Sequence, residues 1–327
     1  MSSRREFSIA LAAGALATTL AAFAQNAPRM YRVGWISLGS PGVPSAFLDA
    51  FRDGLKARGY VEGSNVVIEA RFSDGSRERA DQMVQALVQS KIDVIVSQGG
   101  AAWSAYRHAG SIPVVMGYSG DPVLAGFVES LARPGGTRTG MSFLSLDLVG
   151  KRLEVLAPIL PAGARVAIVA HPEHPGEQNE LRYSQMAAQG LGLKLAYFPV
   201  RTTDQLDAAF ATISSDGVQA VLVFPDALTL EYRDKIAAFG LKARLPTISG
   251  WATYAEGGFL MSYGPNLRDC YANLANYVDR ILKGANPAGI PVELPTSVEF
   301  VINVKTARAI GARLPQALLA RADKVIE

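Results

Sequence analysis

Short runs of apolar, often β-branched residues alternate along the chain with longer stretches in which apolar residues recur at helical spacing. The first run, 31–36, precedes a stretch over 45–58 whose apolar positions share one helical face and which ends at Gly59. The same pattern predicts strands over 65–72, 93–97, 113–117, 165–170, 193–199, 219–224, 259–263 and 297–304, a strand opening at Leu245-Pro246, and helices over 76–89, 101–109, 146–159, 177–189 (stopped by Gly190), 203–214 and 267–283. Strands and helices that alternate in this way indicate βα units on a parallel sheet, so the fold class is α/β.

The pattern also repeats itself. Arg32-Val33 corresponds to Arg165-Val166, and Ile112-Pro113 corresponds to Leu245-Pro246 at the same separation along the chain. Unrelated segments would not keep one separation, so we expect two similar Rossmann-like lobes, each built on a parallel sheet. The turn-rich segment 133–136 lies between the two sets of elements.

The elements that follow the second set are expected to cross back between the lobes. We therefore assign 30–143 plus about 264–288 to an N-terminal lobe, and 144–263 plus about 289–327 to a C-terminal lobe. Open parallel sheets bind their ligands at the carboxyl ends of the strands. The cleft between the lobes is therefore the predicted site.

The first 24 residues have the features of an export signal. The basic pair Arg4-Arg5 precedes a weakly apolar stretch, 8–22, and Ala22-Phe23-Ala24 predicts cleavage before Gln25. The basic pair and its flanks resemble the twin-arginine export motif, and Sec export is the other route. An uncleaved membrane anchor is the alternative, but this stretch is less apolar than a Leu-rich span. We expect a periplasmic protein.

Composition and charge exclude several classes of partner and site. In 327 residues, 32 Lys and Arg face 29 Asp and Glu, and the net charge of +3 creates no field that favours nucleic acid. The single cysteine, Cys270, cannot form an intramolecular disulfide or a zinc site with several thiolates. We expect it to be a small apolar residue on a helix.

The sequence offers little for catalysis. It contains no phosphate-binding loop, nucleophile elbow, dinucleotide fingerprint or metalloprotease motif. His171 and His174 flank Glu173 after a predicted strand, but two ligands in a loop broken by proline make an incomplete metal site. Asp121 and Asp226 precede helical runs, and helix capping is the preferred interpretation for Asp121. We predict a non-enzyme without metal or cofactor.

Candidate ligand-binding residues stand where the predicted strands end. Gly99 and Gly100 would let a ligand approach the helix that starts at Ala101, whose free N–H groups favour an anion, although a plain tight turn explains the two glycines equally well. The predicted site consists of Ser37, Leu38, Gly99, Gly100, Ala101, Tyr118, Ser119, His171, Phe224, Asp226, Trp251 and Tyr263.

Three aromatic residues at strand ends, Tyr118, Trp251 and Tyr263, would give the cleft flat apolar walls with polar rims. Any single aromatic residue is more often part of a core than of a ligand wall. We therefore interpret the other two tryptophans, Trp35 and Trp103, as core or packing residues.

Several short motifs together resemble the ABC-transporter solute-binding family of the tryptophan/tyrosine type. The resemblance covers the chain from about Arg32 to its end, and it implies a type I periplasmic-binding-protein fold, two lobes joined by three crossings, and no catalytic residues. The motifs, in order, are Gly120-Asp121-Pro122-Val123, 130–136, Gly257-Gly258, 261–265, 277–284, Pro291-Val292-Glu293, Val301-Ile302-Asn303 and 319–323.

One loop departs from the family. The usual motif resembles Asn-Pro-x-Asn-Pro, whereas this chain has His171 and His174 at the two asparagine positions. An imidazole that can carry charge near neutral pH therefore replaces an amide at both places.

These observations lead to a specific ligand pose. A carboxylate would be held by Ser37, Ser119 and the N–H groups near Gly100-Ala101, and the body of the ligand would rest on the three strand-end aromatics. If the ligand is an amino acid, Asp226 would pair with its ammonium group. Hinge closure would then trap the small molecule.

The predicted function is the exported solute-binding component of an ABC importer, a monomer that presents a small carboxylate-bearing molecule to a membrane permease. A two-lobed α/β enzyme such as a transferase would use the same cleft, because a fold alone does not define a function. A ligand-sensing module for a membrane receptor would have an identical sequence pattern.

Overall fold

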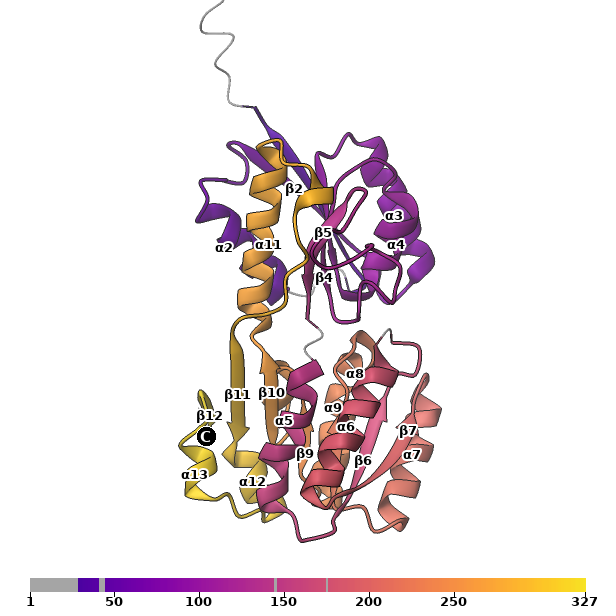
Figure 1. Cartoon of the computed structure of the whole chain (residues 1–327), viewed down its shortest axis with the longest axis vertical. Coiled ribbons are helices and arrows are strands. Elements are labelled where there is room, and N and C mark those ends of the chain that lie inside the picture. The colour runs from indigo at the N-terminus through magenta and orange to yellow at the C-terminus, as the bar shows by residue number, and fades with distance from the viewer. Residues whose placement is uncertain (1–28, 41–44, 144–145, 175) are drawn as a thin grey trace, which may run out of the picture.

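The computed structural model describes residues 29–40, 45–143, 146–174 and 176–327 (Figure 1). The predicted export signal lies outside these ranges. Two α/β lobes stack along the long axis, and the chain passes between them three times (Figure 1). The predicted two-lobed α/β class is confirmed. Within the described ranges, no helix is both long enough and apolar enough to cross a membrane.

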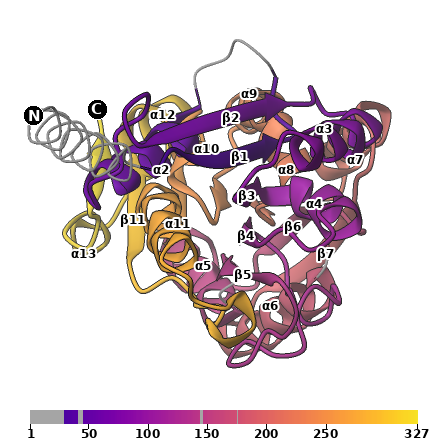
Figure 2. The ribbon, with the colours of Figure 1, turned by 90° about the horizontal axis from the view of Figure 1, so that it is seen from above.

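The N-terminal lobe is built on a sheet of five parallel strands in the order β2-β1-β3-β4-β5. Its strands are β1 (Tyr31–Ser37), β2 (Val66–Phe72), β3 (Val94–Gln98), β4 (Val114–Tyr118) and β5 (Arg138–Ser142). Seen from above, α3 (Arg77–Gln89) and α4 (Ala102–His108) lie on one face, and α2 (Ala46–Lys56) and α11 (Leu267–Leu282) on the other (Figure 2).

Side-chain caps explain where two of these helices begin. The Ser45 hydroxyl accepts a hydrogen bond from the backbone N–H of Leu48 at the start of α2, and Ser76 caps α3 in the same way. Trp35, predicted as a core residue, is fully buried on β1 and packs against Phe51 of α2. The apolar face of α2 that the sequence indicated therefore covers the sheet.

Helix α11 completes the N-terminal lobe although it lies late in the sequence. It packs along α2 so closely that a Cβ added at Gly54 would lie 2.1 Å from the Ala272 carbonyl oxygen. The Tyr60 hydroxyl also donates a hydrogen bond to Asp279. The chain therefore returns to this lobe to cover the face that contains Trp35.

The C-terminal lobe has a seven-stranded sheet in the order β12-β11-β10-β9-β8-β6-β7, parallel except between β10 and β11. Its strands are β6 (Arg165–Ala170), β7 (Lys194–Pro199), β8 (Ala220–Val223), β9 (Thr247–Ser249), β10 (Met261–Pro265), β11 (Val298–Asn303) and β12 (Lys324–Ile326). Its helices are α5 (Leu146–Leu156), α6 (Glu177–Leu191), α7 (Thr203–Ser215), α8 (Ala227–Glu231), α9 (Arg233–Ala243), α10 (Ala252–Glu256), α12 (Val304–Ile310) and α13 (Gln316–Leu319).

The three crossings follow β5, β10 and the 3₁₀ turn at Pro287–Gly289. The last crossing stays with the N-terminal lobe as far as Glu293, because the N–H of Ser142 donates to the Glu293 carbonyl and the N–H of Glu293 donates to the Gly140 carbonyl. The chain then enters β11, which pairs with β10. Each lobe is thus built from separate stretches of sequence.

The structure differs locally from the pattern-based expectations. Strand β5 and helix α9 were not predicted; β5 is a short strand with the small residues Thr139, Gly140 and Ser142 where apolar alternation is weak. The expected helix stop at Gly190 is wrong, since α6 continues to Leu191. Gly192, at φ 65°, adopts the left-handed conformation that ends the helix.

Candidate functional site

A cavity of about 600 Å³ lies between the lobes, where the carboxyl ends of β1, β3 and β4 face those of β6, β8 and β9. Parallel βα units place loops and helix starts at this edge, so short segments from both sheets converge there. Its lining residues are Ser37, Leu38, Gly39, Ser40, Phe47, Asp74, Gly75, Arg77, Gln98, Gly99, Gly100, Trp103, Tyr118, Ser119, Phe143, His171, Glu173, His174, Arg201, Asp226, Ala227, Leu228, Leu230, Glu231, Trp251, Leu267 and Tyr271.

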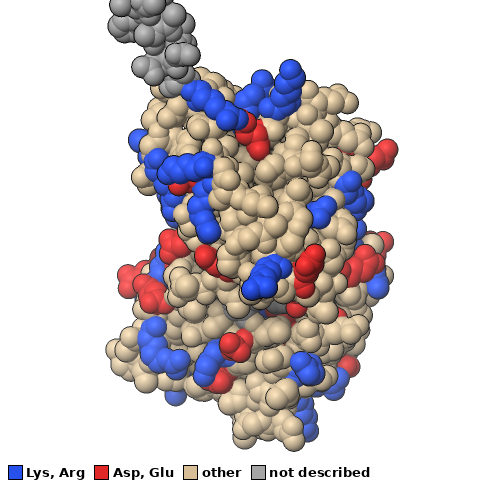
Figure 3. All heavy atoms as spheres, turned by 45° about the horizontal axis from the view of Figure 1, so that its top comes forward, with Lys and Arg blue, Asp and Glu red and all other residues tan. Residues whose placement is uncertain are grey.

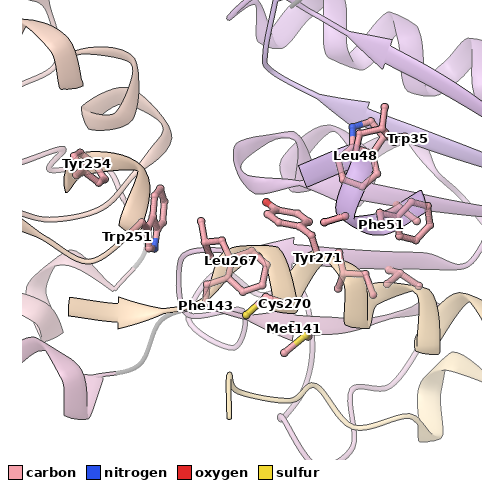
Figure 4. Close-up of a cluster of buried hydrophobic side chains, with 14 of the residues drawn as sticks. Trp35, Leu48, Phe51, Met141, Phe143, Trp251, Tyr254, Leu267, Cys270 and Tyr271 are labelled. Carbon is pink, nitrogen blue, oxygen red and sulfur yellow. The ribbon is translucent and has the colours of Figure 1, made fainter. Parts of the chain in front are cut away.

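Aromatic side chains from both lobes line the cavity. Trp251 comes from the C-terminal lobe and lies opposite Leu267, Phe143 and Tyr271 of the N-terminal side (Figure 4). Tyr271 stacks on Phe47 with ring centroids 4.6 Å apart. Because these rings are packed against one another, they form fixed apolar walls rather than freely moving side chains.

Asp226 is the buried carboxylate of the cavity wall. It begins α8, where its Oδ1 accepts a hydrogen bond from the Leu228 N–H at 2.7 Å, and it forms a capping box with Thr229. His171 Nδ1 lies 3.4 Å from the same oxygen. Burial acts to raise the pKa of Asp226, but the hydrogen bond from His171, the nearby His174 and the Leu228 N–H together hold it below its usual range. The group is therefore ionised at neutral pH.

His174 connects the two lobes. Its Nε2 lies 3.4 Å from the hydroxyl oxygen of Ser119, a residue that follows β4 of the N-terminal lobe.

A buried ion pair lies within the C-terminal lobe. Arg152 Nη1 and Glu180 Oε1 are 3.4 Å apart, and both side chains are almost completely buried. Burial raises the pKa of Glu180 and lowers that of Arg152. The Arg152 Nε–H also donates to the Tyr263 carbonyl on β10, next to a crossing.

Two buried polar groups of the N-terminal wall have no hydrogen-bond partner of good geometry among the described residues. The Tyr118 side chain is 2% exposed, and its hydroxyl lies beside Trp103 without a hydrogen bond of good geometry to any described residue. The side-chain carbonyl oxygen of Gln98, Oε1, is likewise buried without a hydrogen bond to any described residue. Burial raises the pKa of Tyr118, and the charge of Asp226 across the cleft adds to the shift. Unpaired buried polar groups are costly, and both of these residues line the cavity.

The predicted site residues mostly converge on this cavity; Ala101, Phe224 and Tyr263 do not line it. Ala101 is fully buried in the core beneath α3 and α4, and Phe224 is buried in the core of the C-terminal lobe. Tyr263 packs edge-on against Phe300 at 5.7 Å. Ala101 belongs to the 3₁₀ turn after β3 rather than to a strand end. Phe224 follows β8 with its side chain in the core, and Tyr263 lies within β10, before the strand ends at Pro265.

The glycine pair lines the cavity, but each glycine also has a local reason. Gly99 has φ 54°, in the left-handed region that favours glycine. A Cβ at Gly100 would lie 2.9 Å from Leu38 Cδ1. The backbone conformation therefore favours glycine at position 99, whereas a methyl group at position 100 would need only the end of the Leu38 side chain to move.

Sequence reasoning missed several lining residues. Trp103, interpreted as a packing residue, lines the cavity, as do Tyr271 and Leu267 from the first turns of α11 and Phe143 after β5. Their one sequence signal was the expected return of the chain to the N-terminal lobe, because that return places the start of α11 at the cleft.

The rim of the cavity carries charges of both signs. Arg201 pairs with Glu173 at 3.1 Å, whereas Arg77 is exposed and forms no ion pair with a described side chain. On the face shown in Figure 3, basic and acidic side chains are interspersed, and neither sign forms a continuous patch.

Among the described residues, no group of three or more His, Cys, Asp and Glu side chains is arranged to hold a metal ion.

Asp121 accepts backbone hydrogen bonds as a cap does, but the expected helix is wrong, since a turn and no helix follows Asp121. Its Oδ1 accepts hydrogen bonds from the N–H groups of Val123 and Leu124, at 2.8 and 3.1 Å. The residue fixes the turn after β4 and does not line the cavity.

Two parallel-sheet lobes, three crossings and a cavity between the carboxyl edges of both sheets define the type I periplasmic-binding-protein fold. The family model described as ABC transporter substrate binding protein matches residues 42–326. The chain belongs to this family of substrate-binding proteins.

Known relatives and solved structures agree. A tyrosine-binding protein of Clostridioides difficile (strain R20291) is 22% identical over 262 residues, which cover 80% of this chain and 75% of the relative. A structure from Streptococcus pneumonia in complex with L-Trp has a TM-score of 0.83 and 24% identity, covering 90% of this chain and 99% of that one. A conserved domain protein from Vibrio cholerae has a TM-score of 0.80 and 27% identity, covering 91% and 99%.

Proposed function

We propose that this chain is the exported solute-binding component of an ABC importer and that its lobes close around an amino acid or an aromatic acid. The observation that carries the proposal is the cavity of about 600 Å³ whose walls come from both lobes and combine stacked aromatic rings with a buried, ionised carboxylate. A cavity of this size suits a small organic molecule.

The ligand body lies between Trp251 and the aromatic residues of the N-terminal lobe. Its ammonium group, where present, faces Asp226, since an ionised buried carboxylate gains most from a charged donor. Its carboxylate lies near Ser37 and Ser119, with Arg77 supplying positive charge at the rim. The tyrosine-binding relative and the neighbour in complex with L-Trp support an aromatic amino acid as the first class to test.

The remaining parts of the proposal follow from the sequence and the family. The basic, apolar and small-residue regions of 1–24 direct the chain to the periplasm. There the monomer delivers its solute to a membrane permease, which it contacts transiently in the closed, ligand-bound form.

The proposal is tested in two stages. Protein purified under mild conditions is denatured, and any released small molecule is identified by mass spectrometry. Isothermal titration calorimetry then measures a panel of amino acids and aromatic acids against the ligand-free protein, with small-angle scattering to follow closure. Binding with compaction supports the proposal. No released molecule, no heat and no change of shape across the panel would contradict it.

A further inference from the structure

The buried charge of the cavity is concentrated in one place. Among the charged residues that line it, Asp74, Arg77, Glu173, Arg201 and Glu231 are exposed at the rim. Asp226 alone, of the described acidic and basic lining side chains excluding histidine, is buried. The charge that the deepest part of a ligand meets is therefore set by the Asp226 carboxylate and by any group that neutralises its negative charge.

His171 is the group in a position to offset it. The 3.4 Å approach of Nδ1 to the Asp226 carboxylate places the Nδ1 proton on the side of that acceptor. A neutral ring then leaves Asp226 its full negative charge. A second proton, on Nε2, turns the pair into an ion pair whose net charge is zero.

Across the cleft stands the Tyr118 hydroxyl, which has no hydrogen bond of good geometry to any residue that the structure describes. The charge of Asp226 contributes to the raised pKa of Tyr118, so the two groups lie within electrostatic reach of each other. A ligand ammonium between them has hydrogens enough to donate to the carboxylate and to the phenol oxygen at once. A carboxylate in the same place would face a negative charge.

We propose that the protonation state of His171 selects the charge of the ligand, so that the site prefers an ammonium-bearing molecule when the ring is neutral and loses that preference when the ring is protonated. This inference rests on the proposed function and adds to it a specificity-determining residue.

Several charged and titratable groups face His171. Asp226 lies directly against the ring, and His174 belongs to the same loop. The other charged or titratable groups that face this region are Glu173 with its partner Arg201, Glu231 of α8, Tyr118, Arg77 and Asp74 of the N-terminal lobe, and the buried pair Arg152 and Glu180.

The experiment compares ligands that differ only in the ammonium group. Calorimetry measures L-tryptophan, indole-3-propionate and tryptamine, and the equivalent series for tyrosine and leucine, at about pH 5.5 and about pH 8. We expect the preference for the amino acid over its deaminated acid to fall about tenfold at the lower pH, the effect of one offset charge. Tryptamine should show the same loss.

Two variants separate His171 from other titrating groups. His171→Asn should keep the preference for the amino acid at both pH values, and Asp226→Asn should abolish it at both. His108→Asn is the matched control, because His108 Nε2 lies 3.3 Å from Asp81 in a similar pair outside the cavity. It should behave as the unchanged protein. Circular dichroism confirms that each variant is folded.

The outcomes are distinguishable. If amino acids and their deaminated acids bind equally at both pH values, or if His171→Asn retains the full pH dependence, the selector role is overturned while the proposed function stands. If no amino acid and no deaminated acid binds the unchanged protein, the proposed function fails and the selector fails with it.

Discussion

His174 Nε2 lies 3.4 Å from the Ser119 hydroxyl, and the contact connects the C-terminal lobe to the N-terminal lobe across the cavity. Opening the cleft would break it, so the contact contributes only to the closed form. A hydrogen bond of this kind contributes about 0.5–1.5 kcal/mol. The affinity for a ligand that requires closure includes this contribution.

Ser119→Ala should therefore weaken ligand binding by about threefold to tenfold, which corresponds to that hydrogen bond. The free energy of unfolding should change by less than about 0.5 kcal/mol, because each lobe keeps its own core. Calorimetry and denaturant titration measure the two quantities. Ser130→Ala, which removes a local turn contact outside the cavity, is the control and should leave affinity unchanged.

Trp251→Ala should reduce affinity at least about tenfold, because the indole supplies one apolar wall of the cavity. The control is Phe239→Ala on α9, whose ring stacks on Phe210 at 4.1 Å outside the cavity. That variant should lose stability and keep its affinity. Equal affinities for the Trp251 variant and the unchanged protein would remove this residue from the site.

Arg152→Met should lower the free energy of unfolding by about 3–5 kcal/mol, since it leaves the buried Glu180 carboxylate without its cation. The double variant Arg152→Met/Glu180→Leu should recover most of the loss, because no buried charge then remains. Urea unfolding of the two single variants and the double variant measures the coupling. Additive losses would show that the ion pair does not act as a unit.

Two glycines in helices should respond in opposite ways to alanine. Gly54→Ala places a methyl group 2.1 Å from the Ala272 carbonyl oxygen, so α2 and α11 must separate and stability should fall by more than about 1 kcal/mol. Gly190→Ala meets nothing within 4 Å in α6 and should raise stability by about 0.5–1 kcal/mol. Thermal unfolding of both variants checks the signs.

The sequence predicts a site residue when the position of that residue depends only on neighbouring residues in the chain. Ser37, Tyr118, His171 and Trp251 were found because a strand followed by a turn places its end at the cleft, whatever the rest of the fold does. Tyr263 was placed there by the same rule and lies elsewhere, because β10 continues to Pro265 and Tyr263 is therefore not at the strand end.

Residues that reach the cleft from a distant part of the chain were not predictable in this way. Tyr271 and Phe143 line the cavity because two of the crossings deliver them there, and no local pattern records which lobe a helix will join. The exact end of α6 was missed for a local reason. A glycine at position 190 is tolerated inside the helix, and the left-handed turn occurs at Gly192.

The interrupted lobes also set the order in which the protein can fold. The apolar face around Trp35 and Phe51 stays uncovered until α11 has been synthesised, and β10 lacks its antiparallel neighbour until β11 follows. Neither core can close on an incomplete chain, so both lobes mature together and late, through contacts between residues far apart in sequence. Part of the apolar surface of each lobe therefore stays uncovered until the last elements of the chain have been synthesised.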